Sequence, residues 1–279
     1  MYRLLFLLIL LLNTTKGACS QAHQVDFGSV SGSYAAARRG YPEEVYSLIK
    51  KHVKPQACIV DVCCGTGIST RELRDHGFKV IGVDRDQKMI DQALQAEGNS
   101  IPYVLYNLED GLHNSSSIPN QGVAAITVFT GFHWFDESKE ALDGIYESLQ
   151  ENGYFIIVSG LGFTRGKGDS VQAEVERAIA NVIGPLPEKT VDLEASLGGR
   201  FKIVEQRSIS NSATYTPEQF FDLMRSRNYW EGYRNSIVAK IIESEIIGII
   251  NKRKGPDGLI HTTGNTRVVV AQKIPLITS

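Results

Sequence analysis

The sequence predicts an α/β protein built on a doubly wound sheet, because short apolar runs alternate along it with segments of helical character. Apolar runs rich in Val, Ile and Phe occur at residues 59–62, 79–84, 123–129 and 154–158, each followed by polar residues or glycine. The chain has 279 residues, 42% of them hydrophobic, which is enough for one large core. The formal net charge of −2 argues against a broad nucleic-acid-binding surface, so we expect no nucleic-acid partner.

The N-terminus is typical of a secretory signal peptide. Arg3 precedes the apolar run Leu4–Leu12, and small residues follow at 17–20. We therefore interpret residues 1–20 as a signal peptide and residues 26–279 as the folded domain, and we expect a secreted protein or one of the endoplasmic reticulum lumen. The alternative is an uncleaved anchor, the only case in which we expect a membrane contact. Asn114 begins an N-x-S sequon in a polar loop and could carry a glycan.

The first chemical signal is the turn after the first strand, Asp61-Val62-Cys63-Cys64-Gly65-Thr66-Gly67. Gly65 and Gly67 allow the backbone to turn tightly and to approach a ligand, and a helix is predicted to follow up to His76. The dinucleotide fingerprint G-x-G-x-x-G fails because Thr70 stands at its last position, and no Lys of a P-loop follows. A dinucleotide-dependent oxidoreductase is therefore disfavoured.

The other signals lie at the ends of the next strands. The run 79–84 ends in Asp84, nearly twenty residues after Gly65, where a carboxylate can accept both hydroxyls of a ribose. A third strand at 103–106 is followed by Asn107-Leu108-Glu109-Asp110. For these residues a contact with a ligand and an ordinary polar turn are equally good accounts. The fourth strand, 123–129, continues into Thr130-Gly131-Phe132-His133-Trp134-Phe135-Asp136, beyond its carboxyl end, where open α/β sheets bind ligands.

These motifs resemble those of class I S-adenosylmethionine (SAM) dependent methyltransferases. The turn 61–67 resembles their motif D-x-G-x-G-x-G, with Cys63 in place of the first glycine. Residues 132–136 (F-H-W-F-D) and 34–42, which are similar to Y-x-x-x-R-P-x-Y-P with Arg39 replacing the first proline, resemble the type 11, trans-aconitate methyltransferase-like group. Ala124 departs from the Asp usual in that group. The resemblance covers residues 30–273 and implies a seven-stranded sheet with an antiparallel last strand and a helical N-terminal cap over 26–55.

The resemblance implies SAM as the cofactor, a small-molecule methyl acceptor and a set of site residues. The precedent of the group leans towards carboxylates or other small metabolites as acceptors and does not fix one. His133 is the candidate catalytic base and Trp134 a candidate wall for the acceptor, although core packing under the next helix is an alternative role for both. Cys63 and Ala124 motivate a second hypothesis, a secreted SAM-fold binding protein without catalysis. No metal site is expected. The expected cofactor-binding residues are Tyr34, Arg38, Asp61, Cys63, Gly65, Gly67, Asp84, Met89, Leu108, Glu109, Phe129 and Thr130.

The second half of the chain predicts the rest of the sheet. Residues 160–200 read as an insertion after the fifth strand, with a helix capped at Asp169, and a sixth strand is expected at 201–205. Thr216-Pro217-Glu218-Gln219 has the pattern of a capping box, which predicts a helix start. A later helix is expected to bury Val238, Ile242, Ile246 and Ile250, and residues 266–271 are expected to close the sheet.

Overall fold

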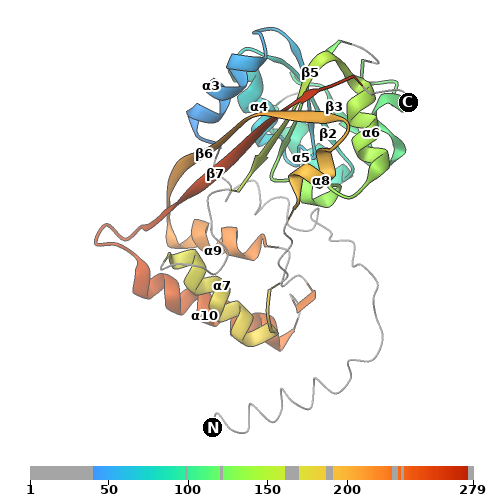
Figure 1. Cartoon of the computed structure of the whole chain (residues 1–279). Coiled ribbons are helices and arrows are strands. Elements are labelled where there is room, and N and C mark those ends of the chain that lie inside the picture. The colour runs from blue at the N-terminus through green and yellow to red at the C-terminus, as the bar shows by residue number, and fades with distance from the viewer. Residues whose placement is uncertain are drawn as a thin grey trace, which may run out of the picture.

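The computed structural model describes residues 40–97, 100–119, 122–160, 170–186, 191–227, 232–233 and 236–275. The expected signal peptide, Tyr34, Arg38 and the expected helix cap Asp169 lie outside these ranges. Within them the chain forms a seven-stranded sheet with the order β3-β2-β1-β4-β5-β7-β6, flanked by helices (Figure 1). The predicted doubly wound α/β fold is therefore confirmed.

The first five strands run parallel to one another. They are β1 (Cys58–Val62), β2 (Lys79–Asp84), β3 (Tyr103–Leu105), β4 (Val123–Phe129) and β5 (Leu149–Ser159). The remaining strands are β6 (Phe201–Tyr215) and β7 (Ile260–Lys273), and β7 lies antiparallel between β5 and β6. Because β1 pairs with both β2 and β4, the strand order reverses beside β1, which is where such sheets open a ligand crevice.

Both faces of the sheet are covered. Along β1, Val60 faces the cluster that includes Ala141 and Ile145 of helix α6 (Lys139–Ser148), whereas Ile59 faces the cluster on the opposite side. That second cluster holds Ile49 of α3 (Glu43–His52) and Leu73 of α4 (Ile68–Asp75). Helix α5 (Gln87–Glu97) connects β2 to β3. The alternation of strand side chains between two buried faces explains why these strands are apolar throughout.

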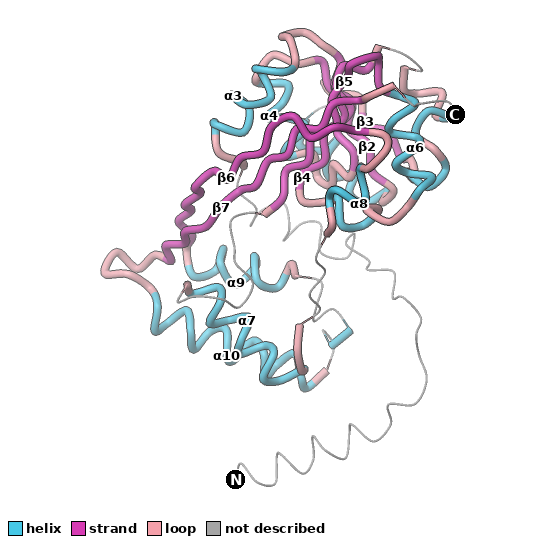
Figure 2. Tube along the Cα trace, viewed as in Figure 1, coloured by secondary structure: helices cyan, strands magenta, loops and turns pink. Residues whose placement is uncertain are grey.

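The strands β6 and β7 are much longer than the sequence predicts. They pair without a break from Phe201 opposite Lys273 to Tyr215 opposite Ile260, apart from one irregularity near Val204, and they run as a ribbon well beyond the sheet (Figure 2). The expected sixth strand ended at 205 because the residues after it are mostly polar and exposed. Their extended conformation is held by hydrogen bonds to β7 and not by burial, so no apolar pattern marks it.

A separate group of helices lies at the far end of this ribbon. Helices α7 (Val171–Ile183), α9 (Pro217–Arg225) and α10 (Ile237–Arg253) pack on one another through their own apolar cluster (Figure 1). We call these three helices the helical lobe. Ile242, Ile246 and Ile250 are buried there as predicted, whereas Val238 is only half-buried. The capping box at Thr216 and Gln219 is confirmed, and α7 is capped by Ser170.

The insertion predicted after the fifth strand is confirmed. It contains α7 and also the short helix α8 (Leu193–Leu197), whose Leu197 returns to the core of the main sheet. Among the described helices, none combines the length and the apolar character needed to cross a membrane.

Candidate functional site

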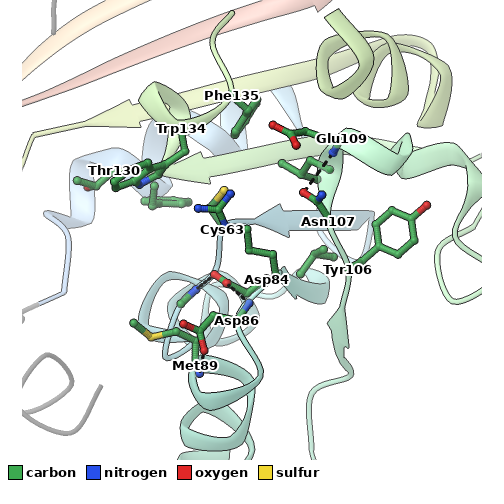
Figure 3. Close-up of a pocket in the computed structure, with 16 residues that line it drawn as sticks. Cys63, Asp84, Asp86, Met89, Tyr106, Asn107, Glu109, Thr130, Trp134 and Phe135 are labelled. Carbon is green, nitrogen blue, oxygen red and sulfur yellow. Dashed lines mark hydrogen bonds between the residues drawn. The ribbon is translucent and has the colours of Figure 1, made fainter. Parts of the chain in front are cut away.

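A cavity lies at the carboxyl ends of β1, β2 and β4, where the strand order reverses (Figure 3). It encloses about 880 Å³ of space, part of it open to solvent. Trp134 and Phe135 lie on one side of it and Met89 on the other (Figure 3). The lining residues are Cys63, Gly65, Val83, Asp84, Arg85, Asp86, Met89, Tyr106, Asn107, Leu108, Glu109, Phe129, Thr130, Gly131, Trp134 and Phe135.

The turn after β1 forms one wall of this cavity. The Cys64 N–H donates to the Val83 carbonyl (3.0 Å), and the Gly65 N–H donates to Asp84 Oδ2 (2.8 Å), so the turn is fastened to the end of β2. Gly65 has a φ of +55°, and the space that a Cβ would occupy there is empty. Gly67 does not line the cavity; its missing side chain leaves room for the Tyr103 hydroxyl.

Asp84 presents its carboxylate to the cavity. Besides the bond from Gly65, its Oδ1 accepts the Asp86 N–H at 3.0 Å (Figure 3). Burial raises the pKa of Asp84, although the two backbone hydrogen bonds oppose that shift. Each carboxylate oxygen can accept a further hydrogen bond, so Asp84 can hold a pair of neighbouring hydroxyls, as a ribose presents them.

Asp61 lies beneath the site and does not line it. It is fully buried, and it accepts hydrogen bonds from three hydroxyls: Ser69 (2.7 Å), Thr70 (2.7 Å) and Thr127 (2.8 Å). Burial raises the pKa of Asp61 to about 6. The structure therefore differs from the expectation that Asp61 contacts the cofactor: this carboxylate ties β1 to α4 and β4. Thr70, the residue that breaks the dinucleotide fingerprint, is one of its donors.

The comparisons with known proteins agree with this architecture. Residues 59–153 match a methyltransferase domain family. The chain is 33% identical over 138 residues to a Dictyostelium discoideum protein named as a methyltransferase, a match that spans about half (48%) of each chain. It is 25% identical over 210 residues to an uncharacterized methyltransferase of Mycobacterium tuberculosis, covering 74% of this chain and 77% of that one. A solved Anaeromyxobacter dehalogenans protein described as a type II methyltransferase superposes with a TM-score of 0.62 at 18% identity, covering 87% and 99% of the two chains.

The described residues have the fold of the class I methyltransferases, and residues 59–153 match a methyltransferase domain. The resemblance of the sequence motifs implied SAM as the cofactor. The residues present fit it, because the open space beside Gly65 and the accessible Asp84 carboxylate suit a nucleoside with a polar tail. Membership of the type 11 group rests on the sequence motifs and stays a prediction.

The fold brings most of the expected cofactor residues to the cavity wall. Met89 and Leu108 supply apolar surface, and Glu109 follows Leu108 in a short helical turn that Asn107 caps by accepting the Glu109 N–H (3.4 Å). Those expected residues that line the cavity are Cys63, Gly65, Asp84, Met89, Leu108, Glu109, Phe129 and Thr130, together with Trp134.

Two lining residues have unusual backbone conformations. Cys63 has a φ of +54° and Thr130 a φ of +60°, in the region that favours glycine. Such residues cost about 1–3 kcal/mol each and gather at functional sites. The two loops also approach closely, because a Cβ placed on Gly131 would lie 2.6 Å from Cys63 Cβ. A glycine, which the methyltransferase motif that this turn resembles carries at the position of Cys63, would be free of that strain.

His133 and Trp134 occupy different positions. Both belong to the short helical turn Phe132–Trp134, and their ring centroids are 4.6 Å apart. Trp134 lines the cavity, as expected of an acceptor wall, whereas His133 is not among the lining residues. The catalytic role of His133 stays a prediction.

The sequence analysis missed several lining residues, all within two positions of expected ones. Arg85 and Asp86 follow Asp84, and Asp86 also caps α5 by accepting the Lys88 N–H at 2.9 Å. An available signal was position alone, because each strand-end loop contributes several consecutive residues. The residues missed in this way are Val83, Arg85, Asp86, Tyr106, Asn107, Gly131 and Phe135.

Proposed function

We propose that this chain transfers the methyl group of SAM to a small-molecule acceptor. The observation that carries the proposal is the cavity at the switch point of the sheet, with the Asp84 carboxylate held by two backbone N–H groups and facing into it. Asp84 would hold the ribose, Leu108, Glu109 and Met89 would contact the adenine, and the loops at Cys63 and Thr130 would line the rest. Bound SAM supplies an electrophilic methyl carbon, so the chain has mainly to orient the acceptor and exclude water.

A carboxylate is the acceptor class that we propose first, because it needs no base to attack a methyl carbon. The described wall supports this choice. Burial raises the pKa of the Cys63 thiol, which keeps it protonated, and His133 lies outside the wall. A thiol of this kind is a poor proton acceptor.

An amine is the second acceptor class. A shallow hollow shares Glu109, Trp134 and Phe135 with the cofactor cavity and is lined further by Asp136, Glu137, Ser138 and Glu140. Carboxylates at this hollow would attract a cation and repel an anion. An acceptor that enters from this side should therefore be an amine.

The test is product formation with methyl-labelled SAM. Purified protein is incubated with separate panels of small carboxylic acids and small amines, and labelled methyl esters or methylamines are identified by mass spectrometry. We expect label in products of one panel, and much less label with Asp84→Ala at the same SAM concentration. Label in neither panel, with SAM still bound, would contradict the proposal and support the alternative of a SAM-binding protein without turnover, which the strained Cys63 motivates.

We also propose that the chain enters the secretory pathway. The proposal rests on Arg3, the apolar run Leu4–Leu12 and the small residues after it. A cleaved leader would give a secreted or luminal enzyme, and an uncleaved one would give a membrane-anchored enzyme.

A further inference from the structure

The strained conformation of Thr130 needs a cause. Thr130 is β-branched, its φ is +60°, and it lines the cavity at the end of β4. A β-branched residue adopts a negative φ unless neighbouring groups hold it at a positive one. On one side its N–H donates to the Val158 carbonyl at 2.7 Å, which fixes the main chain to β5. The side chain must be held by something else.

Tyr41 holds that side chain. Its hydroxyl and Thr130 Oγ1 are 2.9 Å apart and share a hydrogen bond. Its ring packs edge-on against Phe129, with centroids 4.7 Å apart. Tyr41 therefore contacts two consecutive residues of the cavity wall, although it is not itself a lining residue.

Glu72 of α4 fixes Tyr41 in turn. Its carboxylate accepts the Tyr41 N–H at 3.3 Å and also the Tyr46 hydroxyl. The ring of buried Tyr46 stacks on His76 (4.2 Å between centroids) and on Phe129 (6.2 Å), but its hydroxyl bonds Glu72 and no lining residue. The two tyrosine hydroxyls thus bond different partners. The Tyr46 hydroxyl bonds Glu72 of α4, and the Tyr41 hydroxyl bonds Thr130 of the cavity wall.

We propose that Tyr41 is a positioning residue of the SAM cavity, because its hydroxyl keeps Thr130 in the left-handed conformation and so sets the wall formed by Phe129, Thr130 and Gly131. A relaxed Thr130 would shift Gly131, which has little freedom because it faces Cys63 at close range. The inference rests on the proposed SAM-binding function. Tyr41 contacts the wall residues Phe129 and Thr130 without lining the cavity itself.

The test compares Tyr41→Phe with the matched control Tyr46→Phe by calorimetric titration with SAM and by thermal unfolding. Loss of one hydrogen bond should raise the SAM Kd of Tyr41→Phe about five- to tenfold, while relief of strain at Thr130 keeps Tm within about 2 °C. Tyr46→Phe should do the reverse, lowering Tm by removing a partner of the half-buried Glu72 and leaving Kd within about twofold.

A second background sharpens the comparison. Glycine adopts positive φ without strain, so Thr130→Gly should no longer need Tyr41, and adding Tyr41→Phe should then raise Kd by less than about twofold. Equal effects of Tyr41→Phe in both backgrounds, an unchanged Kd in Tyr41→Phe alone, or a Kd loss matched by a Tm loss would each overturn the inference. A wild-type chain that binds no SAM would overturn the proposed function as well, whereas binding without methyl transfer would leave this comparison decisive.

Discussion

Two buried carboxylates near the cavity have different tasks, although burial raises the pKa of both. Asp84 accepts backbone N–H groups and keeps an open side toward the cavity. Asp61 accepts three hydroxyls and is closed off from it. The same residue type thus faces the cavity at the end of β2 and ties β1 to α4 and β4.

Asp61 should make stability depend on pH. Its folded pKa of about 6 lies above the ordinary value of 3.8, so the folded state binds the proton more tightly. The contribution of Asp61 to the free energy of unfolding is therefore fully present below about pH 4 and is lost as pH rises through about 6. The loss amounts to about 3 kcal/mol. Urea unfolding of wild type and Asp61→Asn should be compared at pH 4, 5, 6 and 7. The free energy of unfolding of Asp61→Asn should rise relative to that of the wild type over this range. A constant difference between the two proteins would contradict this assignment.

At this scale the sequence predicted positions better than roles. Residues just after each strand could be placed at the cavity because parallel strands end at one edge of the sheet. The sequence could not reveal that Ser69, Thr70 and Thr127 converge on Asp61, because that depends on how α4 folds back after the turn. Nor could it reveal the positive φ of Thr130, which its residue type disfavours.

Among the secondary-structure elements, α10 shows how packing decides what composition leaves open. The helix carries isoleucines around most of its circumference, and the predicted stripe of Val238, Ile242, Ile246 and Ile250 captured part of its buried face. Its partners α7 and α9 come from two other segments, one before β6 and one after it. The helical lobe could not be predicted, because its three helices are separate segments of the chain and the pairing of β6 with β7 brings them together.

Two neighbouring isoleucines on α10 provide a matched pair for this element. Ile246 is 0% exposed and Ile247 is 48% exposed. Ile246→Ala should lower the free energy of unfolding by about 2–5 kcal/mol through the cavity it leaves. Ile247→Ala should change it by less than about 0.5 kcal/mol, as exposed positions do. Urea unfolding measures both, and equal losses would mean that the lobe packs differently.

The protein combines the sheet of the class I methyltransferase fold with the helical lobe. The seven-stranded sheet and its antiparallel last strand followed from the resemblance to class I methyltransferases. The ribbon and the helical lobe could not be predicted, because the resemblance specifies the number of strands and not how far β6 and β7 extend beyond the sheet. Among the residues that the structure describes, those lining the cavity come from β2, β4, the start of α5 and the loops after β1 to β4.

Export is a prediction for the whole chain. Expressed in a eukaryotic secretory system, the chain should reach the lumen or medium and lose its first residues, since Leu4–Leu12 has the length of a signal-peptide core. N-terminal sequencing of the recovered protein measures this, and replacement of Leu7 and Leu8 by Lys provides the control. Recovery of the intact N-terminus from the cytosolic fraction would contradict export, and its recovery from membranes would favour the anchor.

The central claim is that SAM binds in the cavity at Asp84, and calorimetric titration tests it most directly. The wild-type chain should bind one SAM, and Asp84→Ala should bind about 10- to 150-fold more weakly, as expected for hydrogen bonds to a charged group worth about 1.5–3 kcal/mol. Asp91→Ala, an exposed carboxylate of α5 outside the lining, should bind as wild type does. No binding by the wild type, or equal affinity of wild type and Asp84→Ala, would contradict the account.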